Sequence, residues 1–92
     1  MTEIVVYCGN GGDYEYYQHL AYWAIWIQQN VNGCSFRKNF NIRPHVEADK
    51  CFIIFDNEED AVIFNLKRNG DYIMWSNIDW HGPNVSIPSV FG

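Results

Sequence analysis

Basic residues are scarce in this chain of 92 residues, in which six lysines and arginines face eleven aspartates and glutamates, for a formal net charge of −5. None of the six precedes Arg37, so the first third of the chain carries acidic charge alone. Proteins that bind nucleic acid by neutralising phosphates need the opposite balance. The charge therefore argues against nucleic acid as a partner and favours a protein partner with a basic or neutral surface.

Cysteine is also scarce. The three cysteines, Cys8, Cys34 and Cys51, are widely spaced and match neither a disulfide framework nor a paired metal-binding motif, so we expect reduced, mostly buried thiols. The sequence also lacks the run of about 18 apolar residues that a membrane span needs, and its start has no basic segment followed by an apolar one. We therefore expect a cytoplasmic location and no membrane partner.

The sequence patterns of catalysis, metal binding and cofactor binding are missing too. His19, His45 and His81 fall on three different expected elements, so no local pair could hold a metal ion. The turn at residues 9–12, Gly-Asn-Gly-Gly, has neither the spacing of a dinucleotide-binding turn nor the lysine of a phosphate loop. No Cys or Ser stands beside a base in a nucleophile motif. We predict no enzyme, no metal and no cofactor.

Aromatic side chains, in contrast, are in excess. Four Trp, six Tyr and six Phe make the chain 17% aromatic, within a hydrophobic content of 48%. A single domain of this length buries only about 60 to 65% of the surface of its unfolded chain. We therefore expect some aromatic surface to lie in water or against a partner.

Hydrophobic periodicity predicts an alternation of strands and helices. Residues 3–8 are β-branched and aromatic and lead into the glycine turn, after which Asp13 is placed as the N-cap of a helix running to about Asn30. The remaining pattern predicts a half-buried strand from Cys34 to about Pro44, a strand at Lys50 to Phe55, a helix from the acids at 56–60 to Lys67, and a strand at Asp71 to Trp75.

The resulting order, βαββαβ, is the split βαβ pattern of ferredoxin-like folds. We predict an α+β domain at residues 1–76, with a four-stranded antiparallel sheet and two helices on one face. Residues 77–92 are rich in Asn, Pro and Gly yet carry large apolar side chains. We expect them to form an extended C-terminal arm that packs on the domain or on a partner.

One face of the first helix carries the main binding hypothesis. At 100° per residue, the face expected to be buried contains Tyr17, Leu20, Ala21, Ala24, Ile27 and Val31. The opposite face contains Glu15, Gln18, His19, Tyr22, Ile25, Trp26 and Gln29. Exposed aromatics rimmed by acids and amides are typical of protein interfaces, so Tyr22 and Trp26 are the expected anchors for a partner protein or a second copy of the chain. The alternative is that the C-terminal arm folds back over this face.

Two segments resemble the motifs of RNA-recognition domains. Residues 6–10, Val-Tyr-Cys-Gly-Asn, are similar to the shorter ribonucleoprotein motif, and residues 51–61 look like the end of the longer one. The resemblance implies base stacking on the open face of the sheet, supported by a modest basic patch. The alternative function is therefore a degenerate RNA-recognition-type binder of single-stranded nucleic acid, with the site Tyr7, Phe52, Arg37 and Arg43.

Residues 55–67 are also similar to a recurring stretch in small, uncharacterised phage-encoded proteins. The similarity implies a viral inhibitor that acts in the host cytoplasm by occluding a basic surface of a host protein, including proteins of host defence. The leading hypothesis is thus a small, acidic, non-enzymatic protein-binding module.

Overall fold

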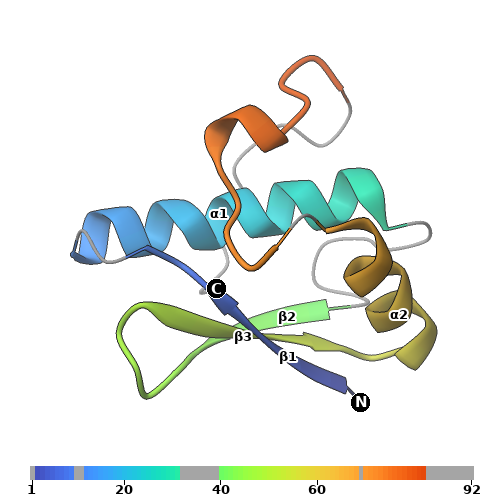
Figure 1. The fold of residues 1–92 in the computed structure, drawn as a ribbon, viewed down its shortest axis with the longest axis horizontal. Helices are drawn as coiled ribbons and strands as arrows, with labels where there is room; N and C mark the ends of the chain where they lie inside the picture. Colours follow the sequence, from blue (N-terminus) through green and yellow to red (C-terminus); the bar gives the residue numbers. More distant parts are fainter. Residues whose placement is uncertain (1, 10–11, 32–39, 69, 83–92) are drawn as a thin grey trace.

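The computed structural model describes residues 2–9, 12–31, 40–68 and 70–82. These residues form an α+β fold with the strands β1 (Thr2–Tyr7), β2 (Phe40–Pro44) and β3 (Lys50–Phe55), the helices α1 (Asp13–Asn30) and α2 (Glu58–Lys67), and a short 3-10 turn, η1 (Trp75–Asn77) (Figure 1). The α+β class is confirmed, and the observed bounds of β1, α1 and β3 lie within one residue of the predicted ones.

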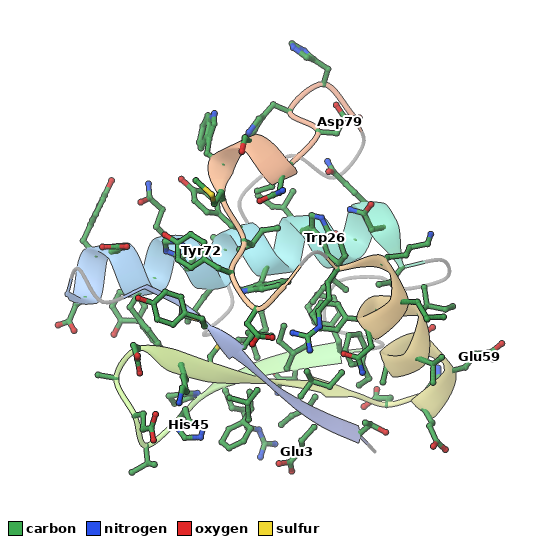
Figure 2. The ribbon with its side chains drawn as sticks, in the orientation of Figure 1. Glu3, Trp26, His45, Glu59, Tyr72 and Asp79 are labelled. Carbon is green, nitrogen blue, oxygen red and sulfur yellow. The ribbon has the colours of Figure 1, made fainter. Side chains whose placement is uncertain are left out.

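The strands form one antiparallel sheet with β3 in the centre, in the order β1-β3-β2. Alternation along each strand buries one face against α1, and the buried side chains are Ile4, Val6, Phe40, Ile42, Cys51, Ile53 and Phe55. Figure 2 shows Glu3 and His45 on the side of the sheet away from α1. Within the described ranges, no helix or strand covers that second face.

The prediction of a fourth strand at Asp71 to Trp75 is wrong. The chain after α2 meets β1 only at an isolated parallel bridge between Tyr7 and Tyr72, where the Tyr7 N–H donates to the Asp71 carbonyl at 2.8 Å. It then crosses α1 and carries η1 to the side of α1 away from the sheet (Figure 1). A four-stranded ferredoxin-like sheet is therefore not confirmed.

Asn77 gives a local reason for this departure from the sheet. The Met74 N–H donates to Asn77 Oδ1 at 3.0 Å, and the Asn77 N–H donates to the Met74 carbonyl at 2.9 Å. A side-chain amide that satisfies nearby backbone groups competes with a strand ladder for the same groups. Ile73 of this segment is buried, but the apolar pattern from which the strand was predicted could not report this competition.

The start of α1 also differs from the expectation. Asp13 is the first helical residue, and the cap is Gly12, which has a φ of 97°. This backbone conformation favours glycine, because any other side chain would be strained there. Asp13 and Glu15 lie in the first turn, where the helix dipole stabilises negative charge. The predicted capping role of Asp13 is thus wrong, and its place at the helix start is right.

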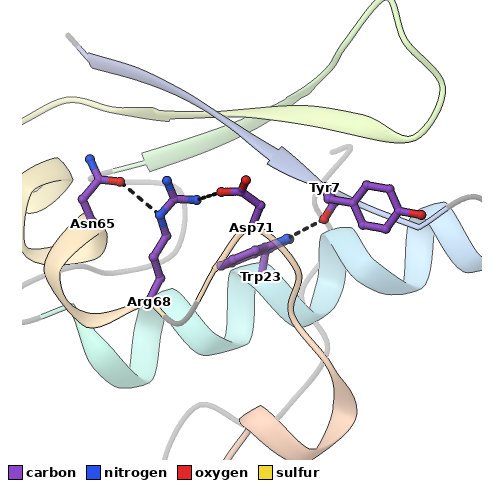
Figure 3. Close-up of polar contacts among 5 residues, drawn as sticks. All are labelled: Tyr7, Trp23, Asn65, Arg68 and Asp71. Carbon is purple, nitrogen blue, oxygen red and sulfur yellow. Dashed lines mark hydrogen bonds and ion pairs between the residues drawn. The ribbon is translucent and has the colours of Figure 1, made fainter.

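The centre of the core is a group of five aromatic side chains, which we call the inner aromatic cluster: Trp23, Trp26, Phe40, Phe55 and Phe64. Phe64 of α2 is its hub, with ring centroids 5.4 Å from Trp23, 5.7 Å from Trp26 and 5.3 Å from Phe55. The Trp23 indole N–H donates to the Tyr7 carbonyl at 3.3 Å (Figure 3). This cluster joins both helices to the sheet.

Arg68 fixes the end of α2 against the segment that follows. Its guanidinium donates to Asn65 Oδ1 at 3.1 Å and to Asp71 Oδ1 at 2.8 Å (Figure 3). The guanidinium carbon also lies 5.3 Å from the centroid of the Phe64 ring, within the range of a cation–π contact. The chain is therefore turned toward α1 directly after the helix.

Candidate protein-binding surface

The face of α1 predicted to bind a partner is buried by the chain itself. Tyr22 is 7% exposed, Ile25 0% and Trp26 7%, so the expectation that these side chains lie in water is wrong. Every residue from His19 to Ile27 is buried, because the sheet covers one side of the helix and α2 and the chain after it cover the others. Helical periodicity locates the apolar stripe nearest the sheet, but it does not show that the opposite stripe is apolar enough to be covered as well.

Coverage by later parts of the chain was the alternative expectation, and the covering segment begins before residue 77. Ile73 and Ile78 belong to the core. On the sheet-facing stripe, Leu20, Ala21, Ala24, Ile27 and Val31 are buried as predicted, whereas Tyr17 is 52% exposed. Most of the predicted arm, residues 83–92, lies outside the described residues.

The polar members of the predicted site, Glu15, Gln18 and Gln29, remain partly exposed. Gln29 holds the chain after η1 through two hydrogen bonds. Its Nε2 donates to the Asp79 carbonyl at 2.8 Å, and its Oε1 accepts from the Asp79 N–H at 3.1 Å. The side chain of Gln29 thus ties residues 78–82 to the last turn of α1.

Aromatic rings cross the outside of α1 in a continuous row, which we call the outer aromatic row: Tyr7, Tyr72, His19, Tyr22, Trp75 and Trp80. The centroid distances between successive rings are 5.1, 4.7, 5.7, 5.8 and 3.8 Å in that order. Figure 2 shows Tyr72 lying against α1. His19 and Tyr22 are buried, and the row becomes exposed toward Trp75.

Trp75 is the most exposed tryptophan of the described chain, at 58% of its surface. Its ring is stacked on Trp80, with an interplanar angle of 27°. The Trp80 indole N–H donates to the Trp75 carbonyl at 2.9 Å. The Tyr22 ring makes a T-shaped contact with each of the two indoles. The indole of Trp75 is therefore held in one orientation with its second face open to solvent. Met74 beside it is also exposed.

The two chain segments that supply most of the row carry acidic charge alone, while Lys50, Lys67 and Arg68 lie near its Tyr7 and Tyr72 end. Residues 13–30 and 71–82 contain Asp13, Glu15, Asp71 and Asp79 and no lysine or arginine. Burial raises the pKa of the Tyr72 phenol, and the nearby Glu15 carboxylate raises it further, which places Glu15 beside this part of the row. Asp71 is paired with Arg68, so Asp13, Glu15 and exposed Asp79 carry the remaining acidic charge of the two segments.

The open face of the sheet holds part of the alternative site. Val5, Phe52 and Arg43 lie in register across the three strands, and the His45 ring lies 4.7 Å from the Phe52 ring. Tyr7 is in register with Lys50, but its ring is engaged with Tyr72 at the sheet edge. The structure therefore brings Phe52 and Arg43 together, and Arg37 lies outside the described residues.

The cavities and polar clusters formed by the described residues offer no catalytic or metal-binding arrangement. Two cavities lined by these residues, of about 190 and 180 Å³, have no Cys or Ser beside a His in their linings. Among the described residues, no three His, Cys, Asp or Glu side chains are placed to hold a metal ion. None of the helices in the described part of the chain is long and apolar enough to cross a membrane.

Sequence reasoning missed Tyr72, Met74 and Trp75 as surface residues, because the segment was expected to be a strand of the sheet. The dense Trp, Met and Tyr content of residues 72–80 was the available signal. Comparison with protein-family models, with curated proteins and with solved structures finds no match.

Proposed function

We propose that this protein is a non-enzymatic protein-binding module whose contact surface is the exposed end of the outer aromatic row. The observation that carries the proposal is the state of Trp75, which is 58% exposed and yet fixed by stacking on Trp80. Binding hot spots are enriched in tryptophan and tyrosine, and a pre-ordered ring loses little conformational entropy when a partner docks. The contact surface we assign is Tyr72, Met74 and Trp75 with Glu15 and Gln18 at its rim.

The partner we propose is a protein segment that presents arginine or lysine. A cation over the face of tryptophan is attracted by the ring quadrupole, and tryptophan is the best aromatic residue for this contact. Glu15 and Asp79 add negative charge at the rim, which would steer a basic partner toward the row. The mechanism is occupancy, in which the module covers the basic surface of its partner.

The more specific reading, in which a phage-encoded inhibitor covers a basic surface of a host defence protein, stays a prediction. It rests on the resemblance of residues 55–67 to phage proteins. The acidic, aromatic surface supports only the proposal of a module that binds a basic partner, because such a surface fits any partner with exposed cations.

The test is a titration with a synthetic peptide of alternating arginine and serine residues, followed by tryptophan fluorescence and calorimetry. We expect saturable binding that weakens with added salt, and no binding of the same peptide with glutamate in place of arginine. Trp75→Ala should lower the affinity about tenfold, which corresponds to about 1.4 kcal/mol.

The matched control is Val5→Ala, which removes an exposed apolar side chain from the open sheet face and should leave the affinity unchanged. The thermal midpoints of both variants should stay near that of the parent chain. Equal binding of the arginine and glutamate peptides, or full affinity in Trp75→Ala, would contradict the proposal.

A second candidate, binding of single-stranded nucleic acid, is favoured by the adjacency of Phe52, Arg43 and His45 on the open sheet face. Stacking platforms beside cations are the usual means of binding single strands. This function predicts salt-sensitive binding of an oligonucleotide that Phe52→Ala abolishes and Trp75→Ala leaves intact. The absence of binding at low salt would dispose of it.

A further inference from the structure

Two of the three cysteines meet inside the fold. Cys8 directly follows β1 and Cys51 is the second residue of β3, and their Sγ atoms lie 2.6 Å apart although 43 positions separate them in the chain. Both side chains are 0% exposed. Val6 pairs with Cys51, and the Cys8 N–H donates to the Asp49 carbonyl at 2.7 Å, so the two thiols are diagonal neighbours on the buried face of the sheet.

We propose that Cys8 and Cys51 are an oxidation site, at which a small peroxide converts the two thiols into an intramolecular disulfide that joins the end of β1 to β3. The two Sγ atoms are already 2.6 Å apart. Small rotations of the two side chains, which move the sulfurs together by a fraction of an ångström, reach the disulfide bond length of about 2.0 Å. The spacing of the cysteines in the sequence gives no sign of this pairing, because it arises only from the register of β1 on β3.

The chemistry balances with hydrogen peroxide as the oxidant. One thiolate attacks a peroxide oxygen, the O–O bond breaks, and the sulfur becomes a sulfenic acid while hydroxide takes up a proton to form water. The second thiol loses its proton and attacks this sulfur, which expels a second hydroxide and forms the S–S bond. The two sulfurs together lose two electrons to the peroxide, and two water molecules are released.

A cavity of about 180 Å³, large enough for hydrogen peroxide, is lined by Gly9, Gly12, Asp13, Tyr16, Ala48 and Asp49. Gly9 directly follows Cys8, but neither sulfur reaches the cavity, so the oxidant must enter through a local opening of the chain beside it. The Tyr16 hydroxyl is buried there and has no hydrogen-bond partner within the described part of the chain. Burial raises the pKa of this phenol to about 12, and the charges of the two sulfurs contribute to the rise.

The groups that face Cys8 also set the pH dependence of its oxidation. The hydrogen bond with Cys51 raises the pKa of the Cys8 thiol well above its usual range, and burial and the charges of Cys51 and Asp49 raise it further. The thiolate is the attacking species, so the reaction should be slow near neutral pH and should accelerate as the pH rises. The oxidation of an exposed cysteine would instead reach half of its maximal rate at a pH of about 8.5.

The experiment uses the full chain, treated with hydrogen peroxide and then digested without reduction for mass spectrometry. We expect a loss of two hydrogen masses and a single cross-linked pair of peptides that contains Cys8 and Cys51. Cys34 in the same chain serves as an internal control and should not take part in the link. The midpoint of thermal unfolding of the oxidised protein should lie about 10 °C or more above that of the reduced one. The bond would close the long chain segment between Cys8 and Cys51, which contains α1, and so restrict the unfolded state.

Several results would overturn the proposal. These are a link that involves Cys34, a cross-link between two chains, a sulfenic or sulfinic acid that never resolves to a disulfide, and no mass change under conditions that oxidise the unfolded chain. Cys51→Ala keeps a small apolar residue at the buried position and should abolish both the cross-link and the thermal shift. If that variant does not fold, the peptide map of the parent chain still decides the question.

Discussion

The two aromatic groups of this protein use the same residue types for different purposes. The inner aromatic cluster is closed on all sides, and each of its five rings is at most 7% exposed. The outer aromatic row shares helix α1 with it, but its exposure rises from buried His19 and Tyr22 to Trp75 at 58%. The inner rings hold two helices on the sheet, whereas the outer row includes an indole, Trp75, that is stacked on Trp80 and still more than half exposed.

The comparison shows that position on α1 does not decide which aromatics are available to a partner. Tyr22 and Trp26 lie on the α1 face that was predicted to be exposed, yet Phe64 packs against Trp26 and the chain after α2 packs against Tyr22. The available ring, Trp75, lies on the covering segment itself. The segment after α2 covers the aromatic side chains of α1 with aromatic side chains of its own. The exposed aromatic surface is therefore on this covering segment and not on α1.

The largest expected effect comes from removing the Trp26 side chain from the inner aromatic cluster. Trp26→Ala removes ring contacts with Trp23 and Phe64, and should lower the free energy of unfolding by about 3 to 5 kcal/mol. Urea unfolding followed by circular dichroism measures this loss. If Trp26→Ala unfolds at the parent's midpoint and loses only peptide binding, Trp26 belongs to the binding surface and the division into two groups fails.

A smaller effect is expected where the outer row is attached to α1. Gln29→Ala removes the two hydrogen bonds to Asp79, and should lower the free energy of unfolding by about 1 kcal/mol. Hydrogen exchange of the amides of residues 78–80 should become faster, while that of β3 stays unchanged. Gln28→Ala is the matched control, because among the described residues the Gln28 side chain donates to the Ala24 carbonyl of its own helix and not to residues 78–82. Equal exchange in the two variants would show that Gln29 does not anchor the segment.

The last effect appears only in alkali, and is absent near neutral pH, and it involves Tyr16, which packs against the core. The pKa of Tyr16 is raised to about 12, so between about pH 10 and 12 the native state holds a proton that the unfolded chain has lost. Stability should therefore fall as the pH rises through this window, and the effect should be absent near neutral pH. Unfolding in urea with a reductant present should show a weaker decline for Tyr16→Phe than for the parent chain. Identical declines would remove Tyr16 as the cause.

Much of the fold could be predicted from the sequence because its signals are local. The β-branched run before the glycine turn predicts β1, the apolar period of 3.6 residues predicts α1, and the run from Lys50 to Phe55 predicts β3. The same reasoning wrongly predicted a strand at Asp71 to Trp75. The side chain of Asn77, two residues further on, turns the chain there into η1, and no short-range hydrophobic pattern reports that turn.

The candidate site was less predictable, because it depends on which surfaces cover one another. Glu15 and Gln18 were predicted and stay at the rim of the proposed surface, while Tyr22, Ile25 and Trp26 were placed in water and are buried. The meeting of Cys8 with Cys51 depends likewise on strand register, which is a tertiary property. Local composition indicated acidic, aromatic segments, but it did not indicate where the proposed surface lies.

The central claim is that a basic partner docks on Trp75, and the four indole N–H resonances of the protein test it most directly. During titration with the arginine–serine peptide, the resonances of Trp75 and Trp80 should shift, while those of Trp23 and Trp26 in the inner aromatic cluster should not. The backbone amides of Arg43 and Phe52 should also stay in place. Shifts confined to Arg43 and Phe52, with the Trp75 resonance unchanged, would contradict the account and place the binding surface on the open face of the sheet.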